Sequence, residues 1–365
     1  MKKLLYLMHV PWGWIKQRPH FLAEELTRHF DVHVFHRKTF GRNTLVQNIV
    51  PSGLTVSVIP MLRLTSLSGV MDHLNNRRIA RYFGAHIADY DIVWVAHPDM
   101  FELVSPVVPP SAVVVYDCMD DHGAFPEVSC NAGLARRLWV REQRLLDRSD
   151  IVFVSSESLG ETLRERYGLA RQPLVVNNGL SLEDAADAPS LPAEVAGPMA
   201  EASFRLVYIG TIAPWLDFPL ILETVERFPQ VTVFLCGPSD EPIPAHERIV
   251  HLGPIQHRYV GGVMAAADAL FMPFQLCELV RGVDPVKLYE YVHSCKPALA
   301  LRYPETLKFG EYIDLYQTQE EFFELLAGLV SGVRGAKKSC DVCRAFSAAN
   351  TWEMRAAYIA SVVTE

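Results

Sequence analysis

The chain has 365 residues, of which 50% are hydrophobic and 21% are charged, and its net charge is -8 at neutral pH. This length is large for a single hydrophobic core and suits two domains of ordinary size. The hydrophobic content excludes an intrinsically disordered chain, and the negative charge argues against a nucleic-acid-binding protein.

Seven cysteines are scattered along the chain, several of them in apolar segments. An odd number without regular spacing is typical of reduced thiols in a cytoplasmic protein. Cys340 and Cys343 form a CxxC pair, but no second pair and no neighbouring histidine accompany it. The pair is therefore weak support for a metal or redox site, and we expect neither a metal ion nor a cofactor.

The first ten residues, MKKLLYLMHV, have the lysines and apolar residues of a signal peptide, but the apolar run ends at Pro11. A first β-strand explains it better, and no stretch approaches the roughly 18 apolar residues of a membrane-spanning helix. We expect a cytoplasmic protein, at most associated peripherally with the inner face of a membrane.

The first half of the chain alternates short apolar runs with helix-patterned segments. Strands are predicted near residues 3–8, 32–35, 55–59, 92–96, 113–116, 151–155 and 174–176, and helices near 18–29, 72–88, 134–147 and 157–167. This alternation predicts a parallel sheet covered by helices on both faces. Ligands of such sheets collect in the loops after the carboxyl ends of the strands.

The loop after the first strand contains Trp14, Arg18 and His20 in the run PWGWIKQRPH. Exposed aromatic and cationic groups before a helix are suited to grip a sugar acceptor or a phosphate. The alternative is that the tryptophans pack under the loop and Arg18 lies on the helix surface. The chain contains neither GxGxxG nor GxxxxGK[ST], so a dinucleotide site or P-loop has no motif to support it.

Two later strands also end in polar residues: His97 follows one, and the run YDCMDDH follows the other. The second run supplies Asp117, Asp120, Asp121 and His122. Clustered carboxylates beside an imidazole are suited to acid–base chemistry, to binding sugar hydroxyls or to holding a metal. A structural alternative is that Asp120 or Asp121 caps the turn after the strand.

Residues 185–203 hold three prolines and many alanines without hydrophobic periodicity, which predicts a linker. A second strand–helix alternation then begins. Gly210 follows its first strand, where the missing side chain lets the backbone approach a ligand.

The run DPVKLYEYVHSCKP, residues 284–297, lies between two apolar runs and predicts the helix of a βαβ unit. Asp284 suits the N-cap and Pro285 the first helical position. The start of such a helix attracts an anion such as a diphosphate, and Lys287 adds a full charge. Glu290, one turn later, is placed to accept hydrogen bonds from sugar hydroxyls, although Lys287 and Glu290 alternatively form a solvent-exposed ion pair.

The KLYEY…KP pattern resembles the donor-binding helix of GT-B glycosyltransferases of the group 1, family 4-like kind. The QRP opening after the first strand and the YD…DD run resemble the bacterial polysaccharide subset of these enzymes, including teichuronic-acid-like synthesis. The resemblance implies two Rossmann-like domains facing across a cleft, with residues 1–184 as the acceptor domain, 204–350 as the nucleotide-sugar domain, and 351–365 as a C-terminal helix that crosses back to the first domain.

The resemblance also implies an activity and its site. A sugar would pass from a nucleotide-diphosphate donor, with UDP the expected nucleotide, to a glycan or lipid-linked acceptor, with retained configuration. Glu290 would hold the ribose of the donor. The donor site would comprise Gly210, Thr211, Arg281, Lys287, Leu288 and Glu290; the catalytic groups Asp117, Asp120, Asp121 and His122; and the acceptor site Trp14, Arg18, His20 and His97.

Two departures from the family pattern leave alternatives open. The Arg and Lys of the family's "GR…KG" loop are absent, since Thr211 and the run 215–217 stand there. Gly282 stands where a Glu usually precedes Glu290 by eight residues. The alternatives are a GT-B-fold epimerase or phosphorylase, and a non-catalytic protein that binds nucleotide sugars.

Overall fold

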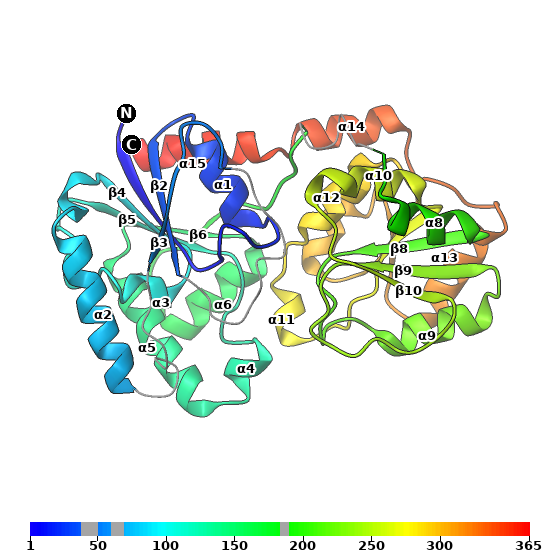
Figure 1. Ribbon diagram of the computed structural model, residues 1–365, viewed down its shortest axis with the longest axis horizontal. Helices are drawn as coiled ribbons and strands as arrows, with labels where there is room; N and C mark the ends of the chain where they lie inside the picture. The colour runs from blue at the N-terminus through cyan, green and yellow to red at the C-terminus, as the bar shows by residue number, and fades with distance from the viewer. Residues whose placement is uncertain (38–49, 60–68, 183–189) are drawn as a thin grey trace. The chain divides into compact units, whose positions relative to one another are not determined.

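A computed structural model describes residues 1–37, 50–59, 69–182 and 190–365. The chain forms two compact units (Figure 1). The first comprises Met1–Asn177 together with Trp352–Glu365, and the second comprises Asn178–Thr351. Each unit is built around one parallel sheet, as the sequence predicts.

The first sheet has the strand order β3-β2-β1-β4-β5-β6-β7, and neighbouring strands are parallel. Its strands are β1 (Lys3–Met8), β2 (Asp31–Arg37), β3 (Thr55–Ile59), β4 (Ile92–Val95), β5 (Val113–Cys118), β6 (Ile151–Val154) and β7 (Leu174–Val175). The register pairs Leu7 with Val95 and Val95 with Tyr116, so β1, β4 and β5 end side by side. The loops after these three strands therefore share one edge of the sheet.

Helices cover both faces of this sheet (Figure 1). They are α1 (Arg18–Leu26), α2 (Gly69–Gly84), α3 (Pro98–Phe101), α4 (Pro126–Ser129), α5 (Ala132–Arg148), α6 (Glu157–Tyr167) and α15 (Trp352–Thr364), with a 3-10 turn η1 (Ile87–Asp89). The Oγ atom of Ser156 accepts a hydrogen bond from the Leu159 amide and caps α6. The terminal helix α15 packs on α1, with Phe21 and Trp352 stacked at 5.1 Å between ring centroids.

The second sheet has the order β10-β9-β8-β11-β12-β13, again with parallel neighbours. Its strands are β8 (Phe204–Ile209), β9 (Val231–Cys236), β10 (Ile249–Gly253), β11 (Ala269–Met272), β12 (Ala298–Leu301) and β13 (Asp314–Tyr316). Its helices are α8 (Ala193–Glu201), α9 (Phe218–Arg227), α10 (Val260–Ala266), α11 (Glu278–Arg281), α12 (Val286–His293), α13 (Gln319–Val330) and α14 (Cys340–Ala348), with 3-10 turns η2 (His257–Tyr259) and η3 (Pro304–Phe309).

The predicted linker contains a helix. Residues 183–189, which include the predicted boundary at 184 and the start of the linker, lie outside the described residues. Residues 193–201, however, form α8, which contains Pro198. Val195 and Met199 are buried in the hydrophobic core of the second unit. Their contact with this core stabilises a helix that the proline- and alanine-rich composition conceals.

The strands are apolar on both faces because helices cover both sides of each sheet. Leu4, Leu5 and Leu7 of β1 are fully buried, as are Leu270 and Phe271 of β11. Among the helices of the described residues, none has the length and apolar character needed to cross a bilayer.

Candidate functional site

Two glycines bring the ends of β8 and β9 into close backbone contact. The amide of Gly210 donates a hydrogen bond to the carbonyl of Cys236 over 2.8 Å. Gly210 and Gly237 have φ angles of +149° and +150°, which side-chain-bearing residues rarely adopt. A Cβ on Gly237 would lie 2.0 Å from the carbonyl oxygen of Gly210. Both positions therefore require glycine, and the backbone at this edge of the second sheet can approach a ligand closely.

Lys287 lies directly over Gly210, at the edge of the second sheet. A Cβ on Gly210 would lie 2.9 Å from the lysine Cε. The Lys287 ammonium lies between two aromatic rings, 4.9 Å from the centroid of Phe274 and 5.5 Å from that of Tyr208. Lys287 and Glu290 do not form the predicted alternative ion pair, since no carboxylate of the described residues lies within 4.0 Å of the ammonium. The side chain is thus a partly buried cation at the start of α12, without an anionic partner in the described part of the chain.

Burial lowers the pKa of Lys287 to about 8, and the nearby charge of Glu290 opposes this shift. A cation that is desolvated but not neutralised gains more than a solvated one from a bound anion. The aromatic faces stabilise it only partly. The arrangement is suited to a diphosphate, which would supply the missing negative charge.

Glu290 lies one turn along α12 and is half-buried. Its Oε1 atom is 3.4 Å from Nε2 of His257, which lies in the η2 turn. The remaining oxygen atom of the carboxylate has no partner among the described residues. Glu290 can therefore accept hydrogen bonds from a ligand while His257 orients it.

The start of α12 differs from the sequence prediction. Pro285 occupies the N-cap and Asp284 caps nothing. The Asp284 carboxylate is buried, pairs with Lys308 at 2.7 Å and accepts a hydrogen bond from the Asn178 amide at 2.5 Å. Asp284 therefore ties the helix start to the first residue of the second unit, a role that depends on contacts with distant segments.

In the first unit, Arg18 and Asp117 form a buried ion pair. Their side chains are 2% and 1% exposed, and Nη2 of Arg18 lies 2.7 Å from Oδ1 of Asp117. Nη1 of Arg18 also donates to the carbonyl of Val176 over 2.7 Å. Both residues join α1, β5 and the segment after β7. Their side chains are occupied by these internal contacts, and the acceptor role of Arg18 and the catalytic role of Asp117 stay predictions.

His20 and Asp121 are also occupied within the protein. Nδ1 of His20 accepts from the Gln17 amide and Nε2 contacts the carbonyl of Pro11, so this buried imidazole holds the loop at the start of α1. Asp121 pairs with Arg166 of α6 through hydrogen bonds of 2.8 and 2.6 Å, which lower the pKa of this carboxyl. The acceptor role of His20 and the catalytic role of Asp121 likewise stay predictions.

Asp120 differs from its acidic neighbours because it is half-buried and its carboxylate forms no ion pair within the described part of the chain. Burial raises the pKa of Asp120 to about 7, and the charge of Arg18 limits the rise. A carboxyl group with a pKa near neutrality is suited to exchange a proton. Of the three predicted acids, Asp120 is the one whose group is available for chemistry.

His97 and His122 meet at the same edge of the sheet, and His9, which follows β1, joins them. The ring centroids of His97 and His122 are 4.3 Å apart, and that of His9 lies 5.1 and 5.5 Å from them. Burial lowers the pKa of all three, that of His122 to about 4. Nδ1 of His9 and Nε2 of His122 have no hydrogen-bond partner within the described ranges of the chain. Neutral imidazoles can donate to and accept from sugar hydroxyls, whereas a phosphate would favour cations.

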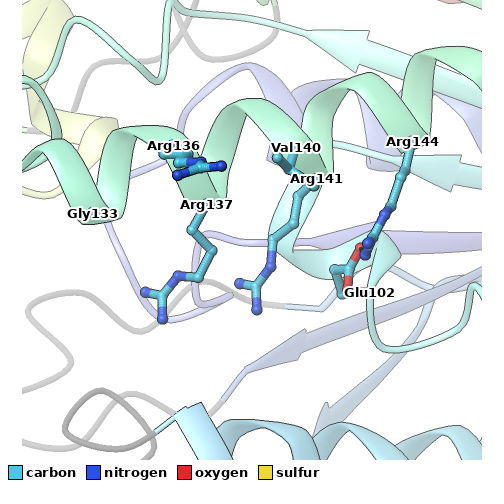
Figure 2. Close-up of a pocket in the computed structure, with 7 residues that line it drawn as sticks. All are labelled: Glu102, Gly133, Arg136, Arg137, Val140, Arg141 and Arg144. Atoms are coloured by element: carbon cyan, nitrogen blue, oxygen red, sulfur yellow. Dashed lines mark hydrogen bonds and ion pairs between the residues drawn. The ribbon is translucent and has the colours of Figure 1, made fainter.

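The outer face of α5 carries a row of arginines (Figure 2). Arg141 pairs with Asp99 at 2.6 Å and Arg144 with Glu102 at 3.4 Å. Arg136 and Arg137 are exposed and have no ion-pair partner among the described residues. This face is a local cation surface on a chain of net charge -8.

The sequence and the fold resemble those of known proteins. The chain is 25% identical over 255 residues to a protein of Bacillus subtilis (strain 168) that is named, provisionally, a teichuronic acid biosynthesis glycosyltransferase, TuaH. The match covers 66% of this chain and 64% of that protein, so it spans slightly less than two thirds of the relative's length. No protein-family model matches the chain.

Two solved structures extend the likeness to the whole chain. Sucrose-phosphate synthase from Thermosynechococcus elongatus has a TM-score of 0.74 at 14% identity and covers 99% of this chain and 98% of its own. Anabaena Alr3699/HepE in complex with UDP-glucose has a TM-score of 0.72 at 15% identity, with all of both chains covered. The chain has the GT-B fold of glycosyltransferases.

The remaining predicted donor residues are Thr211, Arg281 and Leu288. Thr211 is half-buried and its carbonyl accepts a hydrogen bond from Tyr208. Arg281 is exposed at the end of α11. Leu288 is fully buried and its amide donates to the carbonyl of Pro285, and its contact with the donor stays a prediction.

The other predicted acceptor residue of this GT-B protein, Trp14, is half-buried in the loop before α1. Sequence reasoning missed His9, which has no motif around it. It also missed Phe274, whose ring lies next to the Lys287 ammonium. The signal that could have found His9 is its position directly after an apolar strand, like His97.

Proposed function

We propose that the protein is a glycosyltransferase that moves a sugar from a UDP-sugar donor to a glycan or lipid-linked acceptor in polysaccharide biosynthesis, with retention of configuration. One observation carries this proposal: the ammonium of Lys287 is partly buried and has no anionic partner among the described residues. It lies over Gly210 at the start of α12. The name of the Bacillus relative and the UDP-glucose bound in the HepE complex support it.

The donor proposal assigns one task to each group of the second unit. Lys287 and the N-terminus of α12 bind the diphosphate, and Glu290 accepts hydrogen bonds from the ribose. When the bond between the anomeric carbon and the diphosphate breaks, negative charge grows on the leaving group. A preorganised cation stabilises that charge most in the transition state.

The acceptor proposal rests on the first unit. His9, His97 and His122 offer neutral hydrogen-bonding groups, and Asp120 offers a carboxylate that no cation of the described residues neutralises. Such a site suits the hydroxyl groups of a sugar. The acceptor hydroxyl forms the new bond to the anomeric carbon and loses its proton as the diphosphate departs.

Binding of nucleotides tests the donor proposal without an acceptor. We expect UDP, but not GDP or dTDP, to raise the melting temperature, because a ligand at 100 times its Kd stabilises the folded chain by about 2.7 kcal/mol. Glu290→Ala should lose most of this shift and keep the melting temperature of the free protein. Glu324→Ala, which removes an exposed glutamate of α13 in the same unit, is the matched control and should respond like wild type.

The outcomes separate the alternatives. A UDP shift that Glu290→Ala retains, or no shift with any nucleotide, would contradict the donor site. A UDP shift without sugar transfer to any acceptor would favour the non-catalytic nucleotide-sugar-binding protein. UDP-sugar conversion without an acceptor would favour an epimerase.

For the location of the protein we propose the cytoplasm, with peripheral association at the inner face of the membrane. All seven cysteines are free thiols, which fits a reducing compartment. On α5, the cations Arg136 and Arg137 stand beside the exposed apolar side chains of Trp139 and Val140. Cations beside apolar groups favour a surface of anionic lipids.

A vesicle experiment tests this association. We expect the protein to sediment with vesicles that contain phosphatidylglycerol, and the double variant Arg136→Glu/Arg137→Glu to lose most of this binding. Each basic residue near an anionic surface contributes about 1 kcal/mol, so the double reversal should reduce partitioning by roughly tenfold or more. Arg164→Glu/Arg171→Glu, which reverses two exposed arginines elsewhere in the first unit, is the control. Equal sedimentation of both variants would exclude α5 as the contact.

A further inference from the structure

Three cysteines that are distant in the sequence lie together in the second unit. Cys295 follows α12, Cys340 begins α14 and Cys343 lies one turn further on. Sγ of Cys295 is 3.9 Å from the carbonyl oxygen of Cys340, 45 positions away in the chain. The Cys295 thiol also interacts electrostatically with the thiols of both Cys340 and Cys343. The CxxC pair therefore has a third thiol beside it, which the sequence did not reveal.

Helix packing creates this cluster. The rings of Tyr289 on α12 and Phe346 on α14 stack with centroids 6.1 Å apart, so the two helices pack against each other. In the described part of the chain, no three His, Cys, Asp or Glu side chains are arranged to hold a metal ion. Thiol–disulfide exchange needs only two neighbouring sulfur atoms, which the cluster supplies.

The three thiols differ in accessibility. Cys340 is exposed, Cys295 is half-buried and Cys343 is 3% exposed. Cys295 also has a φ of 59°, the left-handed conformation that glycine favours. An exposed thiol next to a partly exposed one is the arrangement in which a small disulfide reagent can reach the first and the second can complete the exchange.

We propose that Cys295 and Cys340 form a reversible disulfide, by exchange with a low-molecular-weight disulfide such as oxidised glutathione, that links the end of α12 to the start of α14. The Cys340 thiolate attacks the small disulfide, forms a mixed disulfide and releases one small thiol. The sulfur of Cys295 then attacks Sγ of Cys340 and releases the second. Two protein thiols are oxidised to one disulfide, the small disulfide is reduced to two thiols, and these take up the two protons.

The chemistry sets the order of the two steps. Burial raises the pKa of the Cys295 thiol to about 12, so this residue supplies little free thiolate at neutral pH. Cys340 is the exposed partner and reacts first. Once the mixed disulfide exists, the adjacent Cys295 reacts at a high effective concentration.

Peptide mapping after oxidation tests the proposal. The folded full-length protein is incubated with oxidised glutathione, its remaining thiols are alkylated, and the digest is examined by mass spectrometry. We expect a peptide that joins Cys295 to Cys340, a loss of two titratable thiols, and a rise of several degrees in the melting temperature, since the cross-link closes a long loop in the unfolded chain. Dithiothreitol should reverse all three.

Variants make the test specific. Cys340→Ser and Cys295→Gly should lose the cross-link and the rise in melting temperature; glycine is chosen at 295 because it suits the positive φ and keeps the fold. Cys130→Ser, which replaces an exposed cysteine of the first unit, should behave like wild type. A wild-type protein that keeps all its thiols, or a cross-link between Cys340 and Cys343 that excludes Cys295, would overturn the proposal.

Discussion

Replacing Arg18 by methionine is expected to lower the free energy of unfolding by about 3–5 kcal/mol, because it leaves a buried carboxylate without a partner. Asp117 is 1% exposed, and the guanidinium of Arg18 supplies its hydrogen bonds at 2.7 to 3.2 Å. The same substitution also removes a hydrogen bond to the carbonyl of Val176. Urea unfolding followed by circular dichroism would measure the loss.

Two controls separate burial from charge in this experiment. Arg205 and Asp268 form a pair of similar geometry, at 2.8 Å, but each is 31% exposed, so Arg205→Met should cost only about 0–1 kcal/mol. The double variant Arg18→Met/Asp117→Leu removes both charges and should be more stable than Arg18→Met alone. Equal losses for Arg18→Met and Arg205→Met would show that the pair in the first unit is not structurally important.

Replacing Lys287 by methionine is expected to abolish most UDP binding and to stabilise the free protein at the same time. The ammonium is partly buried without a counter-ion among the described residues, and burial lowers its pKa to about 8. A pKa decrease of this size corresponds to at most about 3 kcal/mol of cost for the charged form, and we expect roughly 1–3 kcal/mol of stabilisation on its removal. Methionine keeps the contact with the rings of Tyr208 and Phe274.

The pH dependence has a defined sign. Between about pH 8 and the usual lysine pKa, the unfolded chain keeps the proton that the folded chain has released, so the stability of the wild type should rise with pH in this window. UDP binding should weaken as the pH rises past about 8, since the bound anion needs the ammonium form. Lys287→Met should lack both effects.

Calorimetric titration with UDP and urea unfolding, each carried out across the neutral to alkaline range that spans this window, would check the second prediction. Lys338→Met, which removes an exposed lysine of the same unit, should change neither quantity. A Lys287→Met variant that binds UDP like the wild type would remove the main support for the donor site.

The candidate site shows what long-range contacts add to a sequence pattern. The run YDCMDDH presents three acids of equal appearance, yet Arg18, 99 positions from Asp117, and Arg166, 45 positions from Asp121, neutralise two of them. Asp120 remains available. No local pattern distinguishes the three, because the partners of a carboxylate depend on how distant segments pack.

Local patterns in the chain predict both parallel sheets and the position of helix α12, because period and apolar runs belong to neighbouring residues. The GT-B fold and the return of the terminal helix to the first unit were implied by the resemblance to a known family. Strands β1 and β3 and helix α6 lie at their predicted bounds. Packing between distant segments stabilises α8 and buries the Asp284 carboxylate against Lys308. It also leaves Lys287 without an anionic partner among the described residues and places Cys295 beside the CxxC pair. These features arise from burial and from contacts across many positions, which the order of residues alone does not reveal.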